Sequence, residues 1–258
     1  MNKPIGIFDS GVGGTSILNE VHQLLPNEDI IYLADSKNAP YGDKDKEAIL
    51  NLSLKNTEYL LQKHCKLVVV ACNTATTNTI THLIAHYKIP FVGIEPAIKP
   101  AALQTKTKSI GILATKGTLS SSLFLKTSDL FAKDITVIEQ IGEGIVTLIE
   151  EGKLDSEEMR TLLTLYLKPM MAANIDHLVL GCTHYPYLIP ILRELLPNNI
   201  KIIDSGQAVA RQTKHLLLTN NLESKSLGKG KVVLLSNGNP EILESITRHK
   251  YEVIQDNF

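Results

Sequence analysis

Short runs of apolar and β-branched residues alternate along this chain with longer amphipathic segments. The short runs predict strands at Ile5–Phe8, Asp29–Leu33, Leu67–Ala71, Phe91–Ile94, Ser109–Leu113, Ile135–Ile138, His177–Leu180, Ile200–Ile203 and Val232–Leu235. The longer segments predict helices at Asp43–Lys63, Thr74–His86, Leu119–Phe131, Ser156–Ala172 and Gly206–Leu218. Near-continuous apolar strands that alternate with helices are typical of parallel sheets covered on both faces. The pattern therefore predicts an α/β fold.

Three of these strands have partners of similar pattern later in the chain, in the same order. The pairs are Ile5–Phe8 with Ile110–Leu113, the strand before Cys72 with the strand before Cys182, and Ile89–Ile94 with Asn199–Ile203. The separations between partners, 105, 110 and 110 residues, are nearly constant. The repeat predicts two similar α/β units.

The first unit is expected to comprise residues 1–95 together with residues 207–258, and the second to comprise residues 96–206. Small, polar or reactive residues follow three of the strands, at Asp9–Gly14, Cys72–Thr74 and Gly181–His184. Because α/β proteins bind ligands outside the carboxyl ends of their strands, we expect the active site in the cleft between the two units.

Composition indicates which classes of partner the protein can bind and in which cellular compartment it is expected. The chain has 258 residues and a formal net charge of −1, so it carries no basic field for a nucleic-acid backbone. No secretory signal and no apolar run of membrane-spanning length is evident. We therefore expect a cytoplasmic protein that binds neither nucleic acid nor membrane.

The loop after the first strand partly resembles a dinucleotide-binding loop. Gly11-Val12-Gly13-Gly14 opens a turn, and Asp35 ends the next strand, where a ribose-binding acid would lie. However, Ser16 occupies the third glycine position, and the carboxylate of Asp9 would repel a pyrophosphate. We expect no nucleotide here, and interpret the loop amides as donors to a smaller anion such as a substrate carboxylate.

The three cysteines, Cys65, Cys72 and Cys182, are too few and too scattered for a disulfide framework or a CxxC metal site. A lone thiol is more often a small buried residue than a catalyst, and we interpret Cys65 in that way. The other two occupy equivalent places in the repeat, each at the start of a strand-to-helix turn. There the helix dipole would favour a thiolate.

Two equivalent thiols suit the inversion of an amino-acid α-carbon. Without a cofactor, this reaction needs a base on one face of the carbon and an acid on the other, and a thiol titrates close enough to neutrality for both roles. His184 could relay a proton to Cys182, although a surface-loop histidine is the alternative. Asp9 is expected on the strand next to Cys72, and Thr74 as the N-cap of the following helix.

Four motifs in order resemble the glutamate racemase family over nearly the whole chain. They are Asp9–Gly14, Pro40-Tyr41-Gly42, Ala71-Cys72-Asn73-Thr74-Ala75 and Gly181-Cys182-Thr183-His184-Tyr185-Pro186. The resemblance implies two α/β domains of similar fold around a buried cleft. It also implies interconversion of L- and D-glutamate without pyridoxal phosphate, metal or nucleotide, which supplies D-glutamate for bacterial peptidoglycan. Members often form homodimers, but the sequence does not reveal a pairing surface.

The resemblance also implies roles for individual residues. Cys72 matches the base for D-glutamate and Cys182 the base for L-glutamate, with Asp9 and His184 assisting. The positions that match substrate-binding residues are Asp9, Ser10, Tyr41, Gly42, Asn73, Thr74, Thr115, Thr183 and His184. Glu150 matches an acid that partners the histidine, although the adjacent Glu151 leaves the register open and a solvated helix end is an equal alternative.

Other functions stay open at this point. The nearest alternative function is a racemase for aspartate or another small acidic amino acid. The full set of motifs favours a glutamate racemase over this alternative. A non-catalytic amino-acid-binding protein would have no need of two thiols, and a cysteine hydrolase would leave the second thiol unexplained.

Overall fold

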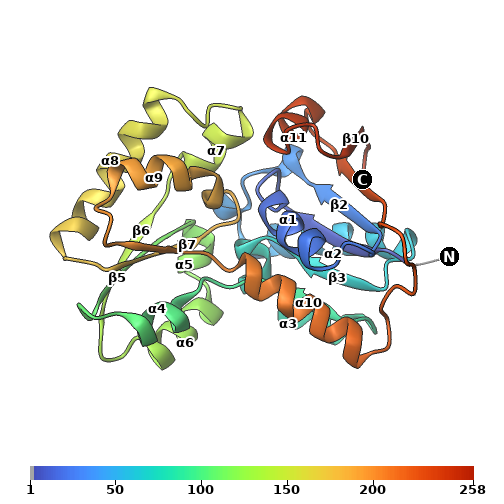
Figure 1. Cartoon of the computed structure of the whole chain (residues 1–258), viewed down its shortest axis with the longest axis horizontal. Coiled ribbons are helices and arrows are strands. Elements are labelled where there is room, and N and C mark those ends of the chain that lie inside the picture. Colours follow the sequence, from blue (N-terminus) through green and yellow to red (C-terminus); the bar gives the residue numbers. More distant parts are fainter. Residues whose placement is uncertain (1–2) are drawn as a thin grey trace.

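The strands of the computed structural model, which describes residues 3–258, form two parallel sheets that lie side by side (Figure 1). Residues 1 and 2 of the predicted first unit lie outside the described residues. The strands are β1 (Ile5–Asp9), β2 (Ile30–Ala34), β3 (Leu67–Val70), β4 (Phe91–Gly93), β5 (Ser109–Ala114), β6 (Thr136–Ile141), β7 (His177–Gly181), β8 (Lys201–Ile203), β9 (Val232–Ser236) and β10 (Glu252–Gln255). Every strand pairing is parallel, which confirms the predicted α/β class.

The strand orders confirm the internal repeat. The larger sheet has the order β10-β9-β2-β1-β3-β4 and the smaller β6-β5-β7-β8. Thus β2-β1-β3-β4 corresponds to β6-β5-β7-β8, and the three predicted strand pairs are β1 with β5, β3 with β7, and β4 with β8. The larger sheet adds β9 and β10 from the end of the chain. The predicted unit boundaries near residues 95 and 206 stay a prediction.

Helices cover both faces of each sheet (Figure 1). They are α1 (Thr15–Leu24), α2 (Lys46–Gln62), α3 (Asn73–His86), α4 (Ile98–Gln104), α5 (Lys116–Leu119), α6 (Ser122–Phe131), α7 (Ile145–Glu150), α8 (Glu157–Ala172), α9 (Ile189–Leu195), α10 (Gly206–Thr219) and α11 (Pro240–Ile246), with 3₁₀ turns η1 (Ser36–Asn38), η2 (Tyr41–Asp43) and η3 (Tyr185–Leu188). Among residues 3–258, none of the helices combines the length and apolar character needed to cross a bilayer.

Strands β1, β3, β5 and β7 are buried along their whole length. This burial explains their continuous apolar sequence, since each fully buried Val, Leu or Ile side chain stabilises the fold by about 1.5–3 kcal/mol. These four strands lie inside their sheets, with a neighbouring strand on each side, and the loops at their carboxyl ends therefore start from the buried part of each unit.

Local capping changes two predicted helices. The helix predicted at Leu119–Phe131 is interrupted, because the Ser121 hydroxyl accepts a hydrogen bond from the Phe124 amide and begins α6 anew. The helix predicted from Asp43 begins at Lys46, because the Asp45 carboxylate caps it through the Ala48 amide at 2.8 Å. Strand β10 was not predicted, since its residues are mostly exposed and lack an apolar run.

Candidate active site

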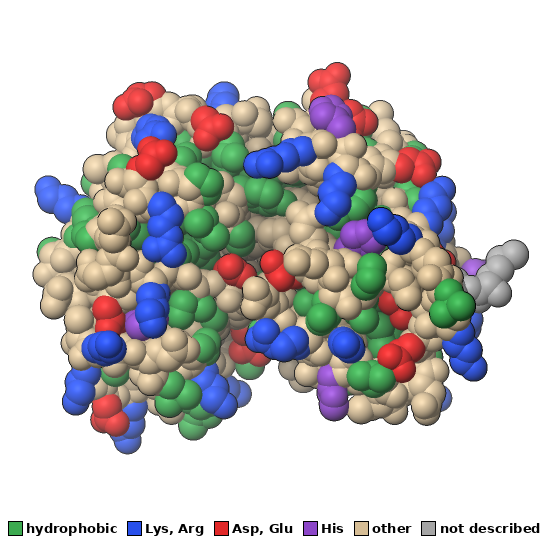
Figure 2. Space-filling view, viewed as in Figure 1, with side chains coloured by type: hydrophobic (Ala, Val, Ile, Leu, Met, Phe, Trp, Pro, Cys, Tyr) green, Lys and Arg blue, Asp and Glu red, His purple; other side chains and the backbone are tan. Residues whose placement is uncertain are grey.

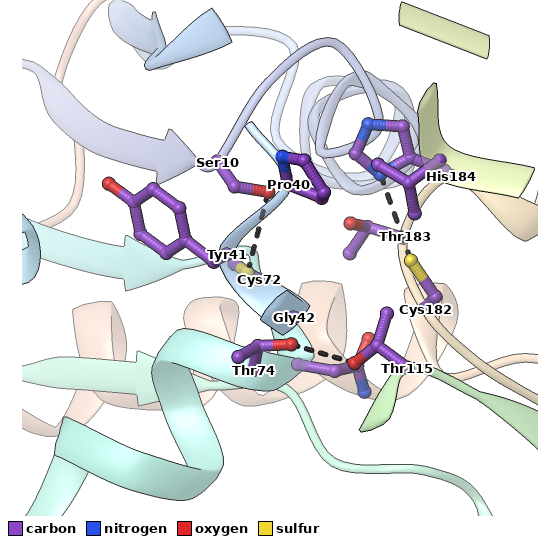
Figure 3. Close-up of a pocket in the computed structure, with 12 residues that line it drawn as sticks. Ser10, Pro40, Tyr41, Gly42, Cys72, Thr74, Thr115, Cys182, Thr183 and His184 are labelled. Atoms are coloured by element: carbon purple, nitrogen blue, oxygen red, sulfur yellow. Dashed lines mark hydrogen bonds between the residues drawn. The ribbon is translucent and has the colours of Figure 1, made fainter. Parts of the chain in front are cut away.

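A small pocket lies where four corresponding strands end, and it contains both candidate catalytic cysteines (Figure 3). Ser10 follows β1 and Cys72 follows β3, whereas Thr115 follows β5 and Cys182 follows β7. The lining residues are Ser10, Pro40, Tyr41, Gly42, Cys72, Asn73, Thr74, Thr115, Val146, Cys182, Thr183 and His184. Asp9 and Glu150 lie behind this lining. The two units thus contribute matching loops to one cavity.

The cavity is closed. Its volume of about 10 Å³ has room for about one water molecule, so an amino acid cannot occupy it in this conformation. On the outer face in Figure 2, the surface is hollowed along the boundary between the two halves. Lys and Arg side chains of the described residues are interspersed there with Asp and Glu and form no continuous basic patch.

Cys72 caps helix α3. Its Sγ accepts a hydrogen bond from the Ala75 amide at 3.4 Å and lies 3.7 Å from the Ser10 hydroxyl oxygen. Burial raises the pKa of the Cys72 thiol strongly, and the nearby charge of Asp9 acts in the same direction, whereas the amide and Ser10 oppose it. The start of helix α3 thus favours the thiolate through the Ala75 amide, as expected, but desolvation outweighs this effect in the pocket.

Thr74 has a different place from the one predicted. Cys72 is the N-cap, and Thr74 is the second residue of the helix, with its hydroxyl turned across the pocket. Its Oγ1 lies 2.8 Å from Thr115 Oγ1 and 3.4 Å from Thr118 Oγ1. These hydroxyls join the two units, as the dashed line between Thr74 and Thr115 shows (Figure 3). Thr118 is a member of this cluster that sequence reasoning missed.

Cys182 is served by a buried histidine. The Nδ1 atom of His184 lies 3.7 Å from Cys182 Sγ, and the ring points at the sulfur (Figure 3). His184 is only 1% exposed, so the surface-loop alternative is wrong. Burial disfavours the charged ring, but hydrogen bonds to Cys182 and Glu150 raise the pKa of His184 well above its usual range.

The ring of His184 is therefore the charged group next to Cys182. A helical segment does follow, because the 3₁₀ turn η3 runs directly into α9 at Ile189, but His184 and not Cys182 is the residue at its N-cap. An imidazolium next to a cysteine sulfur is an arrangement found at reactive cysteines.

Glu150 holds the far side of the histidine ring. Its Oε1 atom lies 2.6 Å from His184 Nε2, and the short contact to a carboxylate makes this ring nitrogen the donor. Glu151 is exposed, and its carboxylate pairs with Lys153 at 2.6 Å. The acid beside the histidine is thus Glu150, which lies at the end of α7.

Asp9 is fully buried behind the pocket. Its Oδ2 accepts hydrogen bonds from the Gly11 and Gly14 amides at 3.1 Å each, and its Oδ1 accepts one from the Thr183 hydroxyl at 3.1 Å. Burial raises the pKa of Asp9 to about 6, although the charge of His184 opposes the rise.

The sequence suggested that the amides of the glycine-rich loop bind a substrate carboxylate. In the structure they bind carboxylates of the protein instead. The Gly11 and Gly14 amides serve Asp9, and the Val12 amide donates to Glu150 Oε1 at 2.6 Å. The anions that this loop binds belong to the protein itself.

Tyr41 is one of the residues that line the pocket, and its hydroxyl points away from both cysteines (Figure 3). The hydroxyl donates to the buried carboxylate of Asp35 and accepts from Asn56 Nδ2 at 3.0 Å. Asn237 also donates to Asp35. Asp35 thus anchors the loop that carries Tyr41, a role that sequence reasoning missed because Asn237 joins it from a distant part of the chain.

Asn73 lines the pocket with a side-chain amide that forms no hydrogen bond to the described residues. It is 3% exposed, and neither its side-chain oxygen nor its nitrogen has a hydrogen-bond partner among residues 3–258. Buried polar atoms are nearly always paired, so an unpaired amide that lines a pocket is available to a ligand.

Two like parallel sheets that bring one cysteine each to a shared, closed pocket define an α/β protein with paired thiols. The model of the Asp/Glu/hydantoin racemase family matches residues 6–213, and this chain belongs to that family.

Individual relatives agree with this assignment. A glutamate racemase of Herpetosiphon aurantiacus is 45% identical over 239 residues, which is 93% of this chain and 94% of the relative. Among solved structures, a glutamate racemase isoform of Bacillus anthracis superposes with a TM-score of 0.88 at 29% identity, covering 99% of this chain and 98% of that one. The Escherichia coli glutamate racemase in complex with L-glutamate and the activator UDP-MurNAc-Ala gives a TM-score of 0.85 at 33% identity, covering 98% and 97%.

Proposed function

We propose that the protein interconverts L-glutamate and D-glutamate by a cofactor-independent transfer of the α-proton between Cys72 and Cys182. The observation that carries the proposal is that both thiols reach one pocket from corresponding positions, after β3 and after β7. Substrate binding or hydrolysis would not require two such groups. The glutamate racemases among the relatives support glutamate as the substrate.

In the proposed reaction the thiolate on one face of the α-carbon removes the proton, and the electron pair stays on the carbon as a carbanion. The thiol on the other face then donates its proton to the carbanion. The first sulfur ends as a thiol and the second as a thiolate, so the enzyme is set for the reverse direction. We assign Cys182 as the base for L-glutamate and Cys72 as the base for D-glutamate.

The neighbouring residues would assist each thiol and hold the substrate. His184 and Glu150 form a chain to Cys182, and Asp9 ends the strand beside β3, which precedes Cys72, so that its charge acts on the Cys72 thiol. We assign substrate contacts to the polar residues that line the cavity, above all to the unpaired amide of Asn73. The remaining assigned contacts are Ser10, Tyr41, Gly42, Thr74, Thr115, Thr183 and His184.

We further propose that the D-glutamate supplies bacterial peptidoglycan and that the protein is a cytoplasmic homodimer that binds neither nucleic acid nor membrane. The chain would divide into one domain of residues 1–95 with 207–258 and one of residues 96–206. The sheet membership of the strands supports this division, because β9 and β10 lie in the sheet of β1.

One experiment separates glutamate racemisation from its alternatives. The protein is incubated in D₂O with L-glutamate or L-aspartate, without added cofactor, and circular dichroism is followed together with the NMR signal of the α-proton. We expect the glutamate dichroism to fall to zero while deuterium replaces the α-proton, because mirror-image products must reach a ratio of one. Turnover of aspartate alone would indicate the related racemase, and no exchange with either amino acid would leave only a binding protein.

A further inference from the structure

The carboxylate of Glu150 is held by residues of the other unit. Glu150 ends α7, in the half of the chain that contains β5 to β8. Its Oε1 accepts from the Val12 amide at 2.6 Å, and its Oε2 accepts from the Ser36 hydroxyl at 2.9 Å. Val12 follows β1 and Ser36 follows β2, so both donors lie in the unit that contains the larger sheet.

The glycines of the Gly11–Gly14 loop leave space for this acid and its histidine. A Cβ atom on Gly11 would lie 1.8 Å from Glu150 Oε1, and one on Gly13 would lie 2.1 Å from His184 Nδ1. The Glu150–His184 pair of the other unit therefore packs directly against the backbone of this loop, in space that side chains at Gly11 and Gly13 would fill. This accounts for glycines that bind no phosphate and whose amides do not face the cavity.

We propose that Ser36 is a positioning residue, which together with the Val12 amide completes the Glu150–His184–Cys182 chain only when the two units are closed. The inference rests on the proposed function, since it concerns the thiol assigned as the base for L-glutamate. Its physical basis is that hydrogen-bond donors stabilise a carboxylate and fix the oxygen that faces the histidine. Separation of the units removes both donors at once, so that the base is fully prepared only in the closed, water-excluding pocket.

Other titratable groups surround this pair. Asp9 on β1 carries a charge that interacts with both His184 and Glu150, Tyr32 on β2 lies near Glu150, and Cys182 contacts the ring directly. These groups are common to the variants compared below, so a change between variants reports on the Ser36 contact.

Ser16 provides a matched control. Its hydroxyl also bridges the units, donating at 2.9 Å to the backbone carbonyl of Thr183, but it does not touch Glu150. Ser16→Ala therefore removes a serine hydrogen bond of the same length between the units without removing a donor from the acid. Ser36→Thr keeps the hydroxyl and serves as the rescue variant.

The test uses the full chain labelled with ¹⁵N-histidine and free of substrate, so that its outcome does not depend on racemase activity. The ring signal of His184, identified by its loss in His184→Gln, is followed against pH in the wild type, Ser36→Ala, Ser36→Thr and Ser16→Ala. We expect the His184 ring to lose its proton at lower pH in Ser36→Ala, because a less firmly held carboxylate stabilises the imidazolium less. Ser36→Thr and Ser16→Ala are expected to titrate as the wild type does.

Kinetics give the second readout. Ser36→Ala should lower kcat/KM for L-glutamate by about tenfold, as expected for loss of a hydrogen bond to a charged group, and Ser36→Thr should recover most of it. If His184 titrates in Ser36→Ala as it does in the wild type, the proposal is overturned. A fall in activity alone would not rescue it, because loss of a serine with a merely structural role could also lower activity. If the wild type itself showed no racemisation, the proposed function would fail while the titration still decided the role of Ser36.

Discussion

The Oγ1 atoms of Thr74 and Thr115 lie 2.8 Å apart and join the first turn of α3 to the residue that caps α5. One threonine belongs to each unit, so their contact closes the wall of the pocket between the two sheets. The cavity behind it has room for about one water molecule. We therefore expect the pocket to widen when an amino acid binds, and the Thr74–Thr115 contact between the units is one that such a movement would change.

Hydrogen exchange should report this opening. Without substrate, amides near residues 71–76 and 113–119 are expected to exchange through the open state, and L-glutamate should slow them because the bound amino acid holds the units together. L-lysine, which carries the opposite side-chain charge, serves as the control ligand. Equal exchange in these segments with and without glutamate would argue against a closing pocket.

The two adjacent acids at the end of α7 form a natural matched pair. Glu150→Gln should lower kcat/KM on the order of 10²-fold, because it removes the charge that holds His184 protonated beside Cys182. Glu151→Gln should stay close to wild type, since Glu151 is exposed and its carboxylate pairs with Lys153, away from His184. The comparison is made by steady-state kinetics with both enantiomers, and equal losses in the two variants would contradict the assigned register.

Gly11 is expected to tolerate no side chain. In Gly11→Ala the added methyl would lie within 1.8 Å of Glu150 Oε1, so either the acid or the loop must move. We expect kcat/KM to fall at least tenfold, at a cost in unfolding free energy of about 1–3 kcal/mol for overpacking. Gly228→Ala is the control, because the nearest atom there is 3.8 Å away and the change should cost less than about 0.5 kcal/mol.

Asp9 should make the protein less stable as pH rises. Its pKa is about 6 in the folded protein against 3.8 as the ordinary value, so the native state binds more protons than the unfolded chain between pH 4 and 6. The free energy of unfolding should therefore fall across this window, by at most about 3 kcal/mol from this residue.

Asp9→Asn should lack this dependence, so its stability relative to the wild type should rise between pH 4 and 7. Urea unfolding at a series of pH values measures the difference, and Asp129→Asn at an exposed position provides the control. A constant difference between wild type and Asp9→Asn over the same range would show that burial does not raise the pKa of Asp9 in the folded protein.

The elements that the sequence predicted well are those whose burial forces a simple pattern. Strands such as β1 and β7 are covered on both faces and must be apolar throughout, so their positions and their repeat could be recognised from sequence. Strand β10 is mostly exposed and has no such constraint, which explains why it was missed.

The site was predictable where chemistry is local in sequence and unpredictable where it is assembled across units. Cys72 and Cys182 follow their strands directly, so their meeting in one pocket followed from the repeat. The role of Ser36 depends on a partner 114 residues away, and no local pattern could indicate it. Thr74 was misplaced as a cap because the thiol of Cys72 takes that position, which propensity alone would not favour.

Replacement of each cysteine tests the two-thiol reaction most directly. Racemisation of L- and D-glutamate in D₂O, without cofactor, is measured for Cys72→Ser, Cys182→Ser and Cys65→Ser. Cys65 is also buried but lies away from the pocket, beneath Gly6, so its variant controls for loss of a buried sulfur. We predict a fall of about 10²–10⁴-fold for Cys72→Ser and for Cys182→Ser, with Cys65→Ser close to wild type. Racemisation near the wild-type rate in either pocket variant would contradict the reaction proposed here.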